Sequence, residues 1–329
     1  PRAAGGDEVP NGFIDGEAGT TGLQIRERLL DRRDLTLLQI QPERRKDAAA
    51  RAEALNAADV AILCLPDEAA REAVALIRNG RTRVIDASTA HRTAPGWIYG
   101  FPEMAAGQRS AVAGADRVSN PGCYPTGFIA LVRPLVAAGL IPPDFPLTVN
   151  AVSGYSGGGK GLIAEFEGGA ADAFRPYGYT LSHKHLPEMQ RYAGLDRPPV
   201  FAPSVGRFAQ GMLVEVPLAL WALRTRPSGQ MLREALAAAY ADARFVEVAD
   251  AAEDGALQEA RAGAGGVVPA LDPEGLNGTN RLRLHVFANE SAGQARLAAI
   301  LDNLGKGASG AAVQCLNLML GADEGEGLG

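Results

Sequence analysis

The sequence predicts an α/β fold, in which a domain built on a parallel sheet is followed by an α+β domain with a mainly antiparallel sheet. Strand-like and helix-like segments alternate four times in the first 90 residues, which is the pattern of a parallel sheet with right-handed crossovers. After residue 121 the apolar segments become longer and alternate residue by residue, as antiparallel strands with one exposed face do. The 329 residues, of which 47% are hydrophobic, are enough for two cores.

Short apolar runs and amphipathic segments define the first domain. The run at residues 59–66 is almost wholly apolar, as expected of a strand that is buried on both faces. The helix expected after it has acidic residues in its first turn and Gly80 after its end, which suits both helix termini. In the first helix, Leu23, Leu29 and Leu30 are expected to share the buried face. Strands are predicted at residues 13–15, 35–40, 59–66 and 83–89, and helices at residues 21–33, 46–56 and 67–80.

Longer alternating segments define the second domain. Its strands are predicted at residues 147–161 (ending in a glycine-rich loop), 211–223, 280–289 and 294–302, and the last two are expected to pair. The final helix, at residues 308–320, is expected to pack back on the first domain, and residues 321–329 are expected to form a disordered tail. The predicted domains are therefore residues 1–120 with 303–329, and residues 121–302.

The composition argues against several classes of protein. The formal net charge is -6 and no long basic run or basic-aromatic patch occurs, so nucleic acid is not an expected partner. No apolar run approaches the roughly 18 to 20 residues that a membrane span needs, and the N-terminal segment lacks the apolar core of a signal peptide. The three cysteines are far apart and odd in number, which indicates a reducing compartment. We expect a cytoplasmic protein with no disulfide framework and no metal site.

The segment GEAGTTG connects the first predicted strand to the first helix and places Gly16, Gly19 and Gly22 at three-residue intervals. A dinucleotide site needs glycines there, because the backbone must approach a pyrophosphate at the helix N-terminus. A plain turn is the alternative, but the strand–loop–helix context favours a Rossmann-type dinucleotide-binding domain. Thr20 and Thr21, between the last two glycines, belong to the predicted site.

The end of the second strand bears on the choice between NAD and NADP. An NAD site usually has an acidic residue there for the ribose hydroxyls, whereas this region reads QIQPERRK. Its basic cluster suits the 2′-phosphate of NADP, and Arg44 or Arg45 is the predicted contact. The alternative is a solvated helix start, which is what most charged runs are. Ser88, at the end of the fourth strand, completes the cofactor contacts predicted in this domain.

The segment SNPGCYPTG places Cys123 directly before an apolar run that predicts a helix. The aligned amides of a helix N-terminus stabilise a thiolate, and Gly122 and Gly127 leave room for a substrate carbonyl. The alternative is a small buried residue at a crossing between domains. Cys64 and Cys315 lie in apolar strand and helix patterns, and we interpret them as core residues.

A catalytic thiol needs a proton-transfer partner, and the chain has four histidines. His183 and His185 lie in SHKHLPEM, in a loop before an expected helix, and Glu188 is placed to fix an imidazole tautomer. Loop histidines are often only solvated, which is the alternative. His91 follows a strand and is the next candidate base, whereas His285 falls in an alternating strand and is interpreted as structural.

Three further segments carry candidate anion contacts. SGYSGGGKG offers the hydroxyls of Ser153 and Ser156, exposed amides and the ammonium of Lys160, which together suit a phosphate or an oxyanion. A flexible hairpin loop is the alternative. Arg92, after the fourth strand, and Arg207, in PSVGRFAQG, are candidate clamps for an anionic substrate.

Taken together, these segments resemble the N-acetyl-γ-glutamyl-phosphate reductases of arginine biosynthesis, in their shorter form. The resemblance covers roughly residues 13–320. It rests on the motifs FIDGEAGTTGLQI, DVAILCLPDEAAREAV, VIDASTAHR, YGFPEM, SNPGCYPTG, SGYSGGGKG, HKHLPEM, PSVGRFAQGM and DNLGKGASGAAVQCLNLMLG. The chain departs from the family's pattern in VPNG before the first strand and in its acidic, glycine-rich C-terminal tail.

The resemblance implies an enzyme that uses NADPH to reduce N-acetyl-L-glutamyl 5-phosphate to N-acetyl-L-glutamate 5-semialdehyde and phosphate through a cysteine thioester. It implies that Cys123 is the nucleophile, that His183 and His185 are the family's histidine pair, and that Asn303 contacts the nicotinamide amide. Of the two histidines, His185 is expected to move the proton and His183 to face the leaving phosphate or the substrate carboxylate. The expected partner is a small acyl phosphate. We also expect a homo-oligomer, a dimer or a tetramer, with an interface built on a long strand of the second domain.

Three alternatives stay open at this point. An aspartate-semialdehyde dehydrogenase would carry out the same chemistry, but HKHLPEM and DNLGKGASG speak against it. A cofactor-free thiol hydrolase or acyltransferase would use Cys123 and His185 but would leave the glycine loop without a role. A catalytically silent NADP-binding regulator would require an unreactive Cys123.

Overall fold

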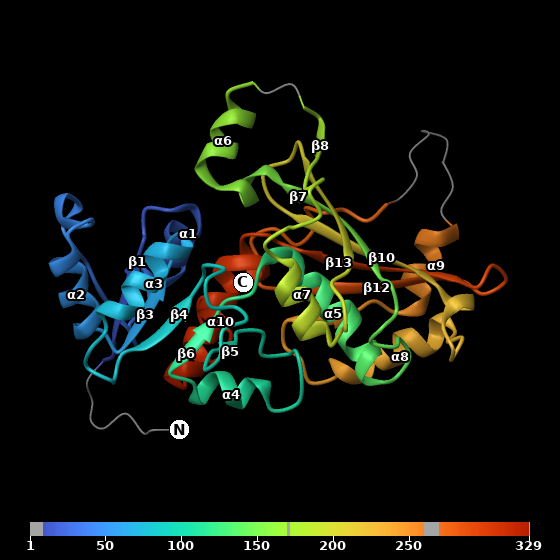
Figure 1. Cartoon of the computed structure of the whole chain (residues 1–329), viewed down its shortest axis with the longest axis horizontal. Helices are drawn as coiled ribbons and strands as arrows, with labels where there is room; N and C mark the ends of the chain where they lie inside the picture. Colours follow the sequence, from blue (N-terminus) through green and yellow to red (C-terminus); the bar gives the residue numbers. More distant parts are fainter. Residues whose placement is uncertain (1–8, 170–171, 260–269, 329) are drawn as a thin grey trace. The chain divides into compact units, whose positions relative to one another are not determined.

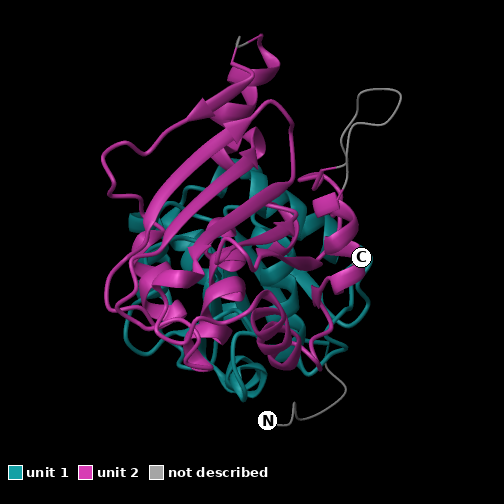
Figure 2. Cartoon of the chain, turned by 90° about the vertical axis from the view of Figure 1, so that its right-hand side faces the viewer, with its two compact units in different colours: residues 1–122, 307–329 teal, residues 123–306 magenta. Residues whose placement is uncertain are grey.

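Two sheets, each with its own helices, organise the computed structural model, which describes residues 9–169, 172–259 and 270–328. One unit comprises residues 1–122 with 307–329, and the other comprises residues 123–306 (Figure 2). The predicted boundaries, after residues 120 and 302, lie a few residues before these two points where the chain passes from one unit to the other. Within the described ranges, no helix is long and apolar enough to cross a membrane.

The first unit is built on a six-stranded sheet in which all neighbouring strands run parallel, so the predicted parallel sheet is confirmed. The strand order is β2-β1-β3-β4-β6-β5 (Figure 1). The strands are β1 (Asn11–Asp15), β2 (Thr36–Leu38), β3 (Val60–Leu63), β4 (Arg83–Asp86), β5 (Ile98–Tyr99) and β6 (Arg117–Ser119). The sequence did not indicate β5 and β6, because segments of two and three residues show no periodicity.

Apolar side chains form one core on each face of this sheet. Ile14 and Ile62 belong to a core shared with α1 and α10, whereas Phe13 and Ala61 belong to a core shared with α2 and α3. This division follows from the alternation of side chains along a strand. The helices are α1 (Thr20–Leu29), α2 (Ala48–Ala57), α3 (Asp67–Leu76), α4 (Gln108–Gly114) and α10 (Gly310–Leu320), with a short 3₁₀ helix at Pro42–Arg44. The predicted return of the last helix to the first domain is confirmed.

The buried face of α1 differs from the prediction. It consists of Gly22, Ile25 and Leu29, whereas Leu23 and Leu30 are 39% and 56% exposed. Positions spaced three and four residues apart share one helix face, and this spacing selects 22, 25 and 29. The prediction followed the apolar character of the leucines and overlooked the small residue that lets the helix approach the glycine loop.

The first strand begins at Asn11, earlier than predicted, although the residues there are poor strand formers. Parallel neighbours on both sides bind its backbone, and the backbone N–H of Asn11 donates to Asp59 Oδ2 at 2.8 Å. Helix α3 ends at Leu76, so Gly80 does not follow it directly and instead occupies a turn with a φ of 66°. The start of β1 and the end of α3 depend on contacts with other segments, which local propensity does not describe.

The prediction of a disordered tail is wrong for residues 321–328. The side-chain amide of Asn317 donates to the carbonyls of Glu324 at 3.1 Å and Glu326 at 2.9 Å. Arg32 Nη1 donates to the side-chain oxygen of Asn317 at 2.6 Å, and Leu328 packs against the core that α1 and α10 share. Buried polar groups of the helices therefore hold a segment whose composition suggested solvation.

The second unit contains a seven-stranded sheet with the order β11-β12-β13-β10-β7-β9-β8 (Figure 1). Four of its six strand pairs are antiparallel, including the predicted pair of β12 and β13, so a mainly antiparallel sheet is confirmed. The parallel pairing of β7 with β9 was not foreseen, because it joins strands that are distant in the chain. The strands are β7 (Thr148–Gly154), β8 (Phe174–Pro176), β9 (Val200–Gly206), β10 (Met212–Ala219), β11 (Val246–Val248), β12 (Leu282–Asn289) and β13 (Gln294–Leu301).

Helix α5 is the central helix of the second unit. It packs against α7, α8 and the strands β10 and β13. A Cβ at Gly127 would lie 3.0 Å from Val214, so the glycine allows the close approach of α5 to the sheet. The helices are α5 (Cys123–Ala137), α6 (Gly159–Glu167), α7 (Leu186–Ala193), α8 (Gly229–Ala239) and α9 (Ala251–Glu259), with 3₁₀ helices at Tyr155–Gly158 and Leu220–Ala222 and a π-helical turn at Gly305–Ser309.

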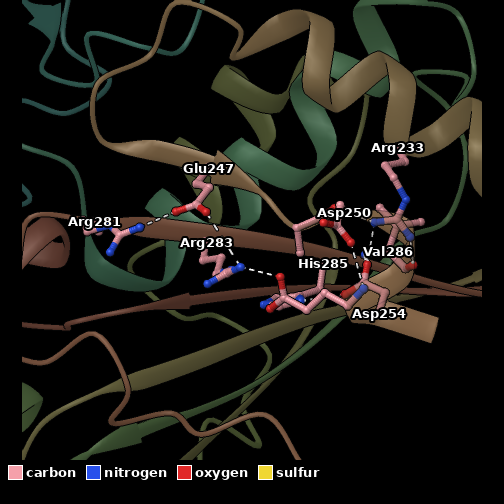
Figure 3. Close-up of polar contacts among 10 residues, drawn as sticks. Arg233, Glu247, Asp250, Asp254, Arg281, Arg283, His285 and Val286 are labelled. Carbon is pink, nitrogen blue, oxygen red and sulfur yellow. Dashed lines mark hydrogen bonds and ion pairs between the residues drawn. The ribbon is translucent and has the colours of Figure 1, made fainter. Parts of the chain in front are cut away.

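A buried polar cluster ties α8, α9 and β12 together (Figure 3). Asp254 accepts hydrogen bonds from Arg233 Nη1 at 2.6 Å, from the ring Nδ1 of His285 at 2.8 Å and from the backbone N–H of Val286 at 2.9 Å. Burial raises the pKa of Asp254, but these three hydrogen bonds outweigh it and lower the pKa below its ordinary value. His285 therefore has the structural position that its strand pattern predicted.

Candidate active site

Helix α5 begins at Cys123, as the sequence predicted, and most of the residues behind it are buried. The thiol is half-buried at the end of the helix where backbone N–H groups lack intrahelical partners. These amides and the helix dipole favour an anion, so a thiolate at this position is stabilised. The geometry suits a nucleophile that a substrate can reach.

Two tyrosines beside this thiol were missed by the sequence analysis. The hydroxyl of Tyr177 donates to the hydroxyl of Tyr124 at 3.3 Å, and Tyr124 donates to the carbonyl of Ser204 at 3.1 Å. Burial is the main cause that raises the pKa of both phenols, and the negative charge of Cys123 adds to it. Both phenols therefore stay neutral hydrogen-bond donors next to the thiol. Nothing in their spacing along the chain indicates this pairing.

The two predicted histidines lie against the same tyrosine. The ring centroids of His183 and His185 are 6.2 Å and 6.0 Å from that of Tyr124, and 4.7 Å from each other. His185 precedes the first residue of α7 and is 6% exposed. Both imidazoles therefore lie against the residue that follows Cys123 in the first turn of α5, within the second unit.

The two imidazoles differ in their surroundings. The backbone N–H of His185 donates to Nδ1 of His183 at 3.2 Å, so the proton of a neutral His183 ring lies on Nε2. Burial, together with the charge of Lys184, lowers the pKa of His183 to about 4. His183 is therefore a neutral donor near pH 7. Glu188 lies in the first turn of α7 and is 1% exposed, and its predicted role in orienting His185 stays a prediction.

The glycine-rich segment after β7 is folded, so its interpretation as a flexible hairpin is wrong. It forms a 3₁₀ helix and then α6, and hydrogen bonds from Asn303 hold it in place. The side-chain amide of Asn303 donates to Ser156 Oγ at 3.0 Å, and its oxygen accepts from the backbone N–H of Gly211 at 2.7 Å. These two bonds use one N–H and one lone pair of the carboxamide, and the predicted contact of Asn303 with a nicotinamide stays a prediction. Ser153, 3% exposed, hydrogen-bonds the hydroxyl of Tyr124 and so joins this segment to the thiol.

Two basic residues predicted for the substrate lie at the surface of the second unit. Lys160, at the start of α6, is exposed. Arg207 is also exposed, and its Nη1 donates to the carbonyl of Asp172 at 3.5 Å. Both are accessible to an anion, and their assignment stays a prediction.

The other two cysteines lie in apolar surroundings. Cys315 is fully buried in the core shared by α1 and α10, and Cys64 packs against the same core. Burial, with help from the charges of Asp86 and Asp15, raises the pKa of Cys64 to about 12. Neither thiol is positioned as a nucleophile, in agreement with their interpretation as core residues.

The glycine loop lies in the first unit, between β1 and α1. Gly16 has a φ of 89°, and a Cβ there would lie 2.3 Å from the carbonyl oxygen of Cys64. A Cβ at Gly22 would lie 2.5 Å from the carbonyl oxygen of Gly16. Gly19 precedes Thr20 and Thr21 at the N-terminus of α1 and closes the turn by donating to Gly16 at 3.0 Å. The loop thus presents a helix N-terminus to an anion, as a pyrophosphate site requires.

A cavity of about 510 Å³ opens beside this loop. Its walls come from the glycine loop, the end of β2, the segment at residues 42–46 and α2. Arg45 lines the cavity, whereas Arg44 does not and instead forms an ion pair with Asp47 at 3.8 Å. Of the two arginines that the sequence offered for a 2′-phosphate, the structure therefore favours Arg45.

The segment after β4 forms a buried polar cluster in the first unit. Asp86 Oδ2 accepts from Ser88 Oγ at 2.7 Å and lies 2.6 Å from Nδ1 of His91, whose ring stacks on Trp97. Arg92, 8% exposed, donates from Nε to the carbonyl of Asn120 at 3.0 Å. Ser88 and Arg92 thus each have a hydrogen-bond partner within this segment or next to it, and their contacts with cofactor and substrate stay predictions.

A larger cavity, of about 720 Å³, lies elsewhere in the second unit. Residues of β10, β12 and β13 line it, among them Pro217, Phe287 and Arg296. None of the predicted site residues contributes to its walls. It belongs to the seven-stranded sheet and the loops beside it, and no role is assigned to it.

Comparison with known proteins identifies both units. Residues 16–112 match the model of the semialdehyde dehydrogenase NAD binding domain, and residues 123–303 match that of the semialdehyde dehydrogenase dimerisation domain. An N-acetyl-gamma-glutamyl-phosphate reductase from Chelativorans sp. (strain BNC1) is 59% identical over 312 residues, which cover 94% of this chain and 97% of that protein. Another from Trichormus variabilis is 53% identical over 327 residues, which cover 97% and 99%.

Solved structures with the same fold have more distant sequences. Aspartate semialdehyde dehydrogenase II from Vibrio cholerae is 16% identical with a TM-score of 0.68, and the match covers 95% of this chain and 99% of that one. Aspartate semialdehyde dehydrogenase with NADP from Candida albicans is 13% identical with a TM-score of 0.62, covering 96% and 99%. At these identities the likeness supports the fold alone.

Proposed function

Because the chain belongs to the N-acetyl-gamma-glutamyl-phosphate reductases of the semialdehyde dehydrogenase family, we propose that it reduces an N-acetylglutamyl acyl phosphate. The reaction converts N-acetyl-L-glutamyl 5-phosphate and NADPH into N-acetyl-L-glutamate 5-semialdehyde, phosphate and NADP, a step of arginine biosynthesis. The single observation that carries the proposal is the position of Cys123 at the start of α5, next in the chain to Tyr124, against which two imidazoles lie.

The chemistry starts at Cys123. Its thiolate attacks the acyl carbon, the bond from that carbon to the phosphate oxygen breaks, and phosphate leaves with the bonding electrons. A thioester on Cys123 is the result. NADPH, when bound, supplies the hydride that reduces the thioester carbon. His185 gives a proton to the oxyanion formed there and takes it back as the carbon–sulfur bond breaks, which releases the aldehyde and restores the thiolate.

The remaining contacts in the second unit bind and orient the substrate. His183 is a neutral donor and suits the leaving phosphate or the substrate carboxylate, because its low pKa keeps a proton only on Nε2. Ser153, Ser156, Lys160 and Arg207 are the proposed anion contacts of this unit, and Glu188 is the proposed support of His185. Arg92, in the first unit, is a further proposed anion contact. Asn303 would hold the glycine-rich segment and, through the second N–H or lone pair of its carboxamide, the nicotinamide amide.

The first unit fits a dinucleotide, and we propose NADP. A Cβ at Gly16 or Gly22 would collide with backbone, so the loop keeps open the space that a pyrophosphate needs. Gly16, Gly19, Thr20, Thr21 and Gly22 would hold the pyrophosphate, and Ser88, in the segment after β4, is a further proposed cofactor contact. Arg45 would hold the 2′-phosphate, because it lines the adjoining cavity.

Domain roles, assembly and location follow from the same proposal. We assign NADP binding to residues 1–120 with 303–329, and catalysis to residues 121–302. The match to a dimerisation domain at residues 123–303 supports a homo-oligomer, either a dimer or a tetramer. The free thiols of Cys64, Cys123 and Cys315 support a reducing compartment, and we propose the cytoplasm.

The proposal is tested by the reverse reaction, with N-acetylglutamate 5-semialdehyde, phosphate and NADP, followed at the absorbance of NADPH. Turnover is expected with this semialdehyde, and aspartate semialdehyde should be a poor substrate. The Cys123→Ser variant should lose activity while keeping its thermal stability and NADPH binding, because a serine hydroxyl is a far weaker nucleophile near pH 7. The matched control, Cys315→Ser, should stay active. Retention of more than a few per cent of the activity in Cys123→Ser would contradict the mechanism.

A further inference from the structure

Six charged side chains line the cavity beside the glycine loop, and their signs balance. Asp15, Glu17 and Glu43 are acidic, and Arg45, Lys46 and Arg51 are basic. A site that accepts a phosphate dianion usually presents a surplus of positive charge. In this cavity, the acidic residues therefore counteract the cations that would recognise the 2′-phosphate.

Two ion pairs account for most of this balance, and they differ in accessibility. Arg51 donates from Nε at 3.0 Å and Nη2 at 2.8 Å to Asp15 Oδ2, and these side chains are only 13% and 6% exposed. Arg45 Nη2 contacts Glu17 Oε1 at 2.5 Å, and the Arg45 side chain is 40% exposed. The pair of Arg51 and Asp15 is buried and links α2 to β1. The second can reach a ligand.

Glu17 also has a second cation within reach. Arg26 Nε lies 3.9 Å from Glu17 Oε2, which is an ion-pair distance but too long for a hydrogen bond. This buried Nε has no hydrogen-bond partner in the described part of the chain. A small movement of the Glu17 carboxylate away from Arg45 would therefore satisfy Arg26.

We propose that Glu17 moderates the preference for NADP by pairing with Arg45, and that the 2′-phosphate binds by taking the place of the Glu17 carboxylate. On binding, Arg45 exchanges a carboxylate for a phosphate, and Glu17 turns to Arg26. The exchange favours the phosphate, because a dianion with three acceptor oxygens forms stronger charge-assisted hydrogen bonds than a carboxylate. A ligand without the 2′-phosphate gains nothing from Arg45. This inference rests on the proposed use of NADP.

Glu17 therefore lowers the affinity for NADP while it protects the cavity from other anions. Its removal should leave Arg45 free to bind the phosphate without competition. The gain should be about two- to fivefold, because a half-exposed ion pair is screened by water. Removal of Arg45 should cost at least tenfold, since charge-assisted hydrogen bonds to the phosphate are then lost.

Calorimetric binding of 2′,5′-ADP and 5′-AMP to the full-length protein tests the exchange without any turnover. Glu17→Gln is expected to bind 2′,5′-ADP about two- to fivefold more tightly, with 5′-AMP unchanged. Arg45→Gln should weaken 2′,5′-ADP at least tenfold, and in the double variant the gain from Glu17→Gln should disappear. Arg44→Gln is the matched control, because it removes the same charge outside the cavity and should change neither ligand.

The possible results separate the inference from the proposed function. If the wild type binds 2′,5′-ADP no better than 5′-AMP, the use of NADP is wrong and the inference falls with it. If the wild type prefers 2′,5′-ADP but Glu17→Gln leaves that preference unchanged or reduces it, NADP stands and the exchange is refuted. Weakening of both ligands alike by Glu17→Gln would also refute it, since Glu17 would then only shape the glycine loop.

Discussion

Substitution of Gly22 by alanine should weaken NADPH binding by displacing the glycine loop itself. A Cβ at this position would lie 2.5 Å from the carbonyl oxygen of Gly16 and 2.8 Å from the Cα of Glu17. Both neighbours are backbone atoms, so no side chain can turn aside. Restoring an ordinary contact of 3.4 Å requires the loop or the helix to move by about 0.9 Å.

The size of the effect follows from the cost of overpacking, which is roughly 1–3 kcal/mol. For a domain of this size, that strain lowers the unfolding midpoint by about 2–10 °C. Binding of the cofactor must restore the original loop, so the Kd for NADPH should rise by about 5- to 150-fold. Thermal unfolding of the free protein and fluorescence titration with NADPH measure the two quantities separately.

Gly19 provides a matched comparison within the same loop. A Cβ there would lie 3.4 Å from the carbonyl oxygen of Gly16 and 3.9 Å from that of Cys64, which are ordinary contacts. Gly19→Ala should therefore unfold at the wild-type temperature but still bind NADPH weakly, because the methyl group would face the pyrophosphate. The reasoning is refuted if Gly22→Ala keeps wild-type stability and affinity, or if Gly19→Ala loses as much stability as Gly22→Ala.

Two further predictions concern the histidine cluster and the buried carboxylate of the second unit. His185→Asn should lower kcat by roughly 100- to 10,000-fold, whereas His183→Asn should mainly raise KM for the acyl phosphate. Burial and the charge of Lys184 lower the pKa of His183 to about 4, so its effect on KM should be constant from pH 6 to 9 in steady-state kinetics. If His183→Asn lowers kcat and His185→Asn raises KM instead, the two histidines have the opposite roles. Asp254→Asn should destabilise the protein by roughly 3 kcal/mol at pH 7, since it breaks a buried ion pair, while the exposed Asp250→Asn should not. The pKa of Asp254 is lower in the folded than in the unfolded state, so its contribution to the free energy of unfolding is present above about pH 4 and is lost as the pH falls. In urea unfolding, the difference in free energy between the wild type and Asp254→Asn should therefore shrink at low pH. A difference that is constant with pH would contradict this role of Asp254.

Several features of the site could be predicted from the sequence because they depend on a few neighbouring residues. An apolar run directly after Cys123 is enough to predict that the thiol stands at a helix N-terminus. The spacing of Gly16, Gly19 and Gly22 between a strand and a helix predicts a loop that approaches a pyrophosphate. Strands that pair through tight connections, such as β12 and β13, follow from alternation and a short turn.

Other parts of the site depend on segments that are distant in the chain. Tyr177 reaches Tyr124 across 53 positions, and Asn303 reaches Ser156 across 147. Periodicity carries no information about such partners, because it reports which face of an element is buried and not what lies against that face. Leu23 was placed in the core for a different reason, because the prediction followed its apolar character although the helical spacing selects Gly22, Ile25 and Leu29.

Backbone preferences and side-chain periodicity act over a few residues, so they are enough to predict the alternation of strands and helices, the glycine loop and the helix that begins at the thiol. Contacts between distant segments are needed to place Arg45 rather than Arg44 at the cavity and to pair it with Glu17. Adjacent arginines have the same local propensity and the same charge. Their surroundings differ only because the fold places Arg45 opposite the carboxylate of Glu17, which comes from another loop.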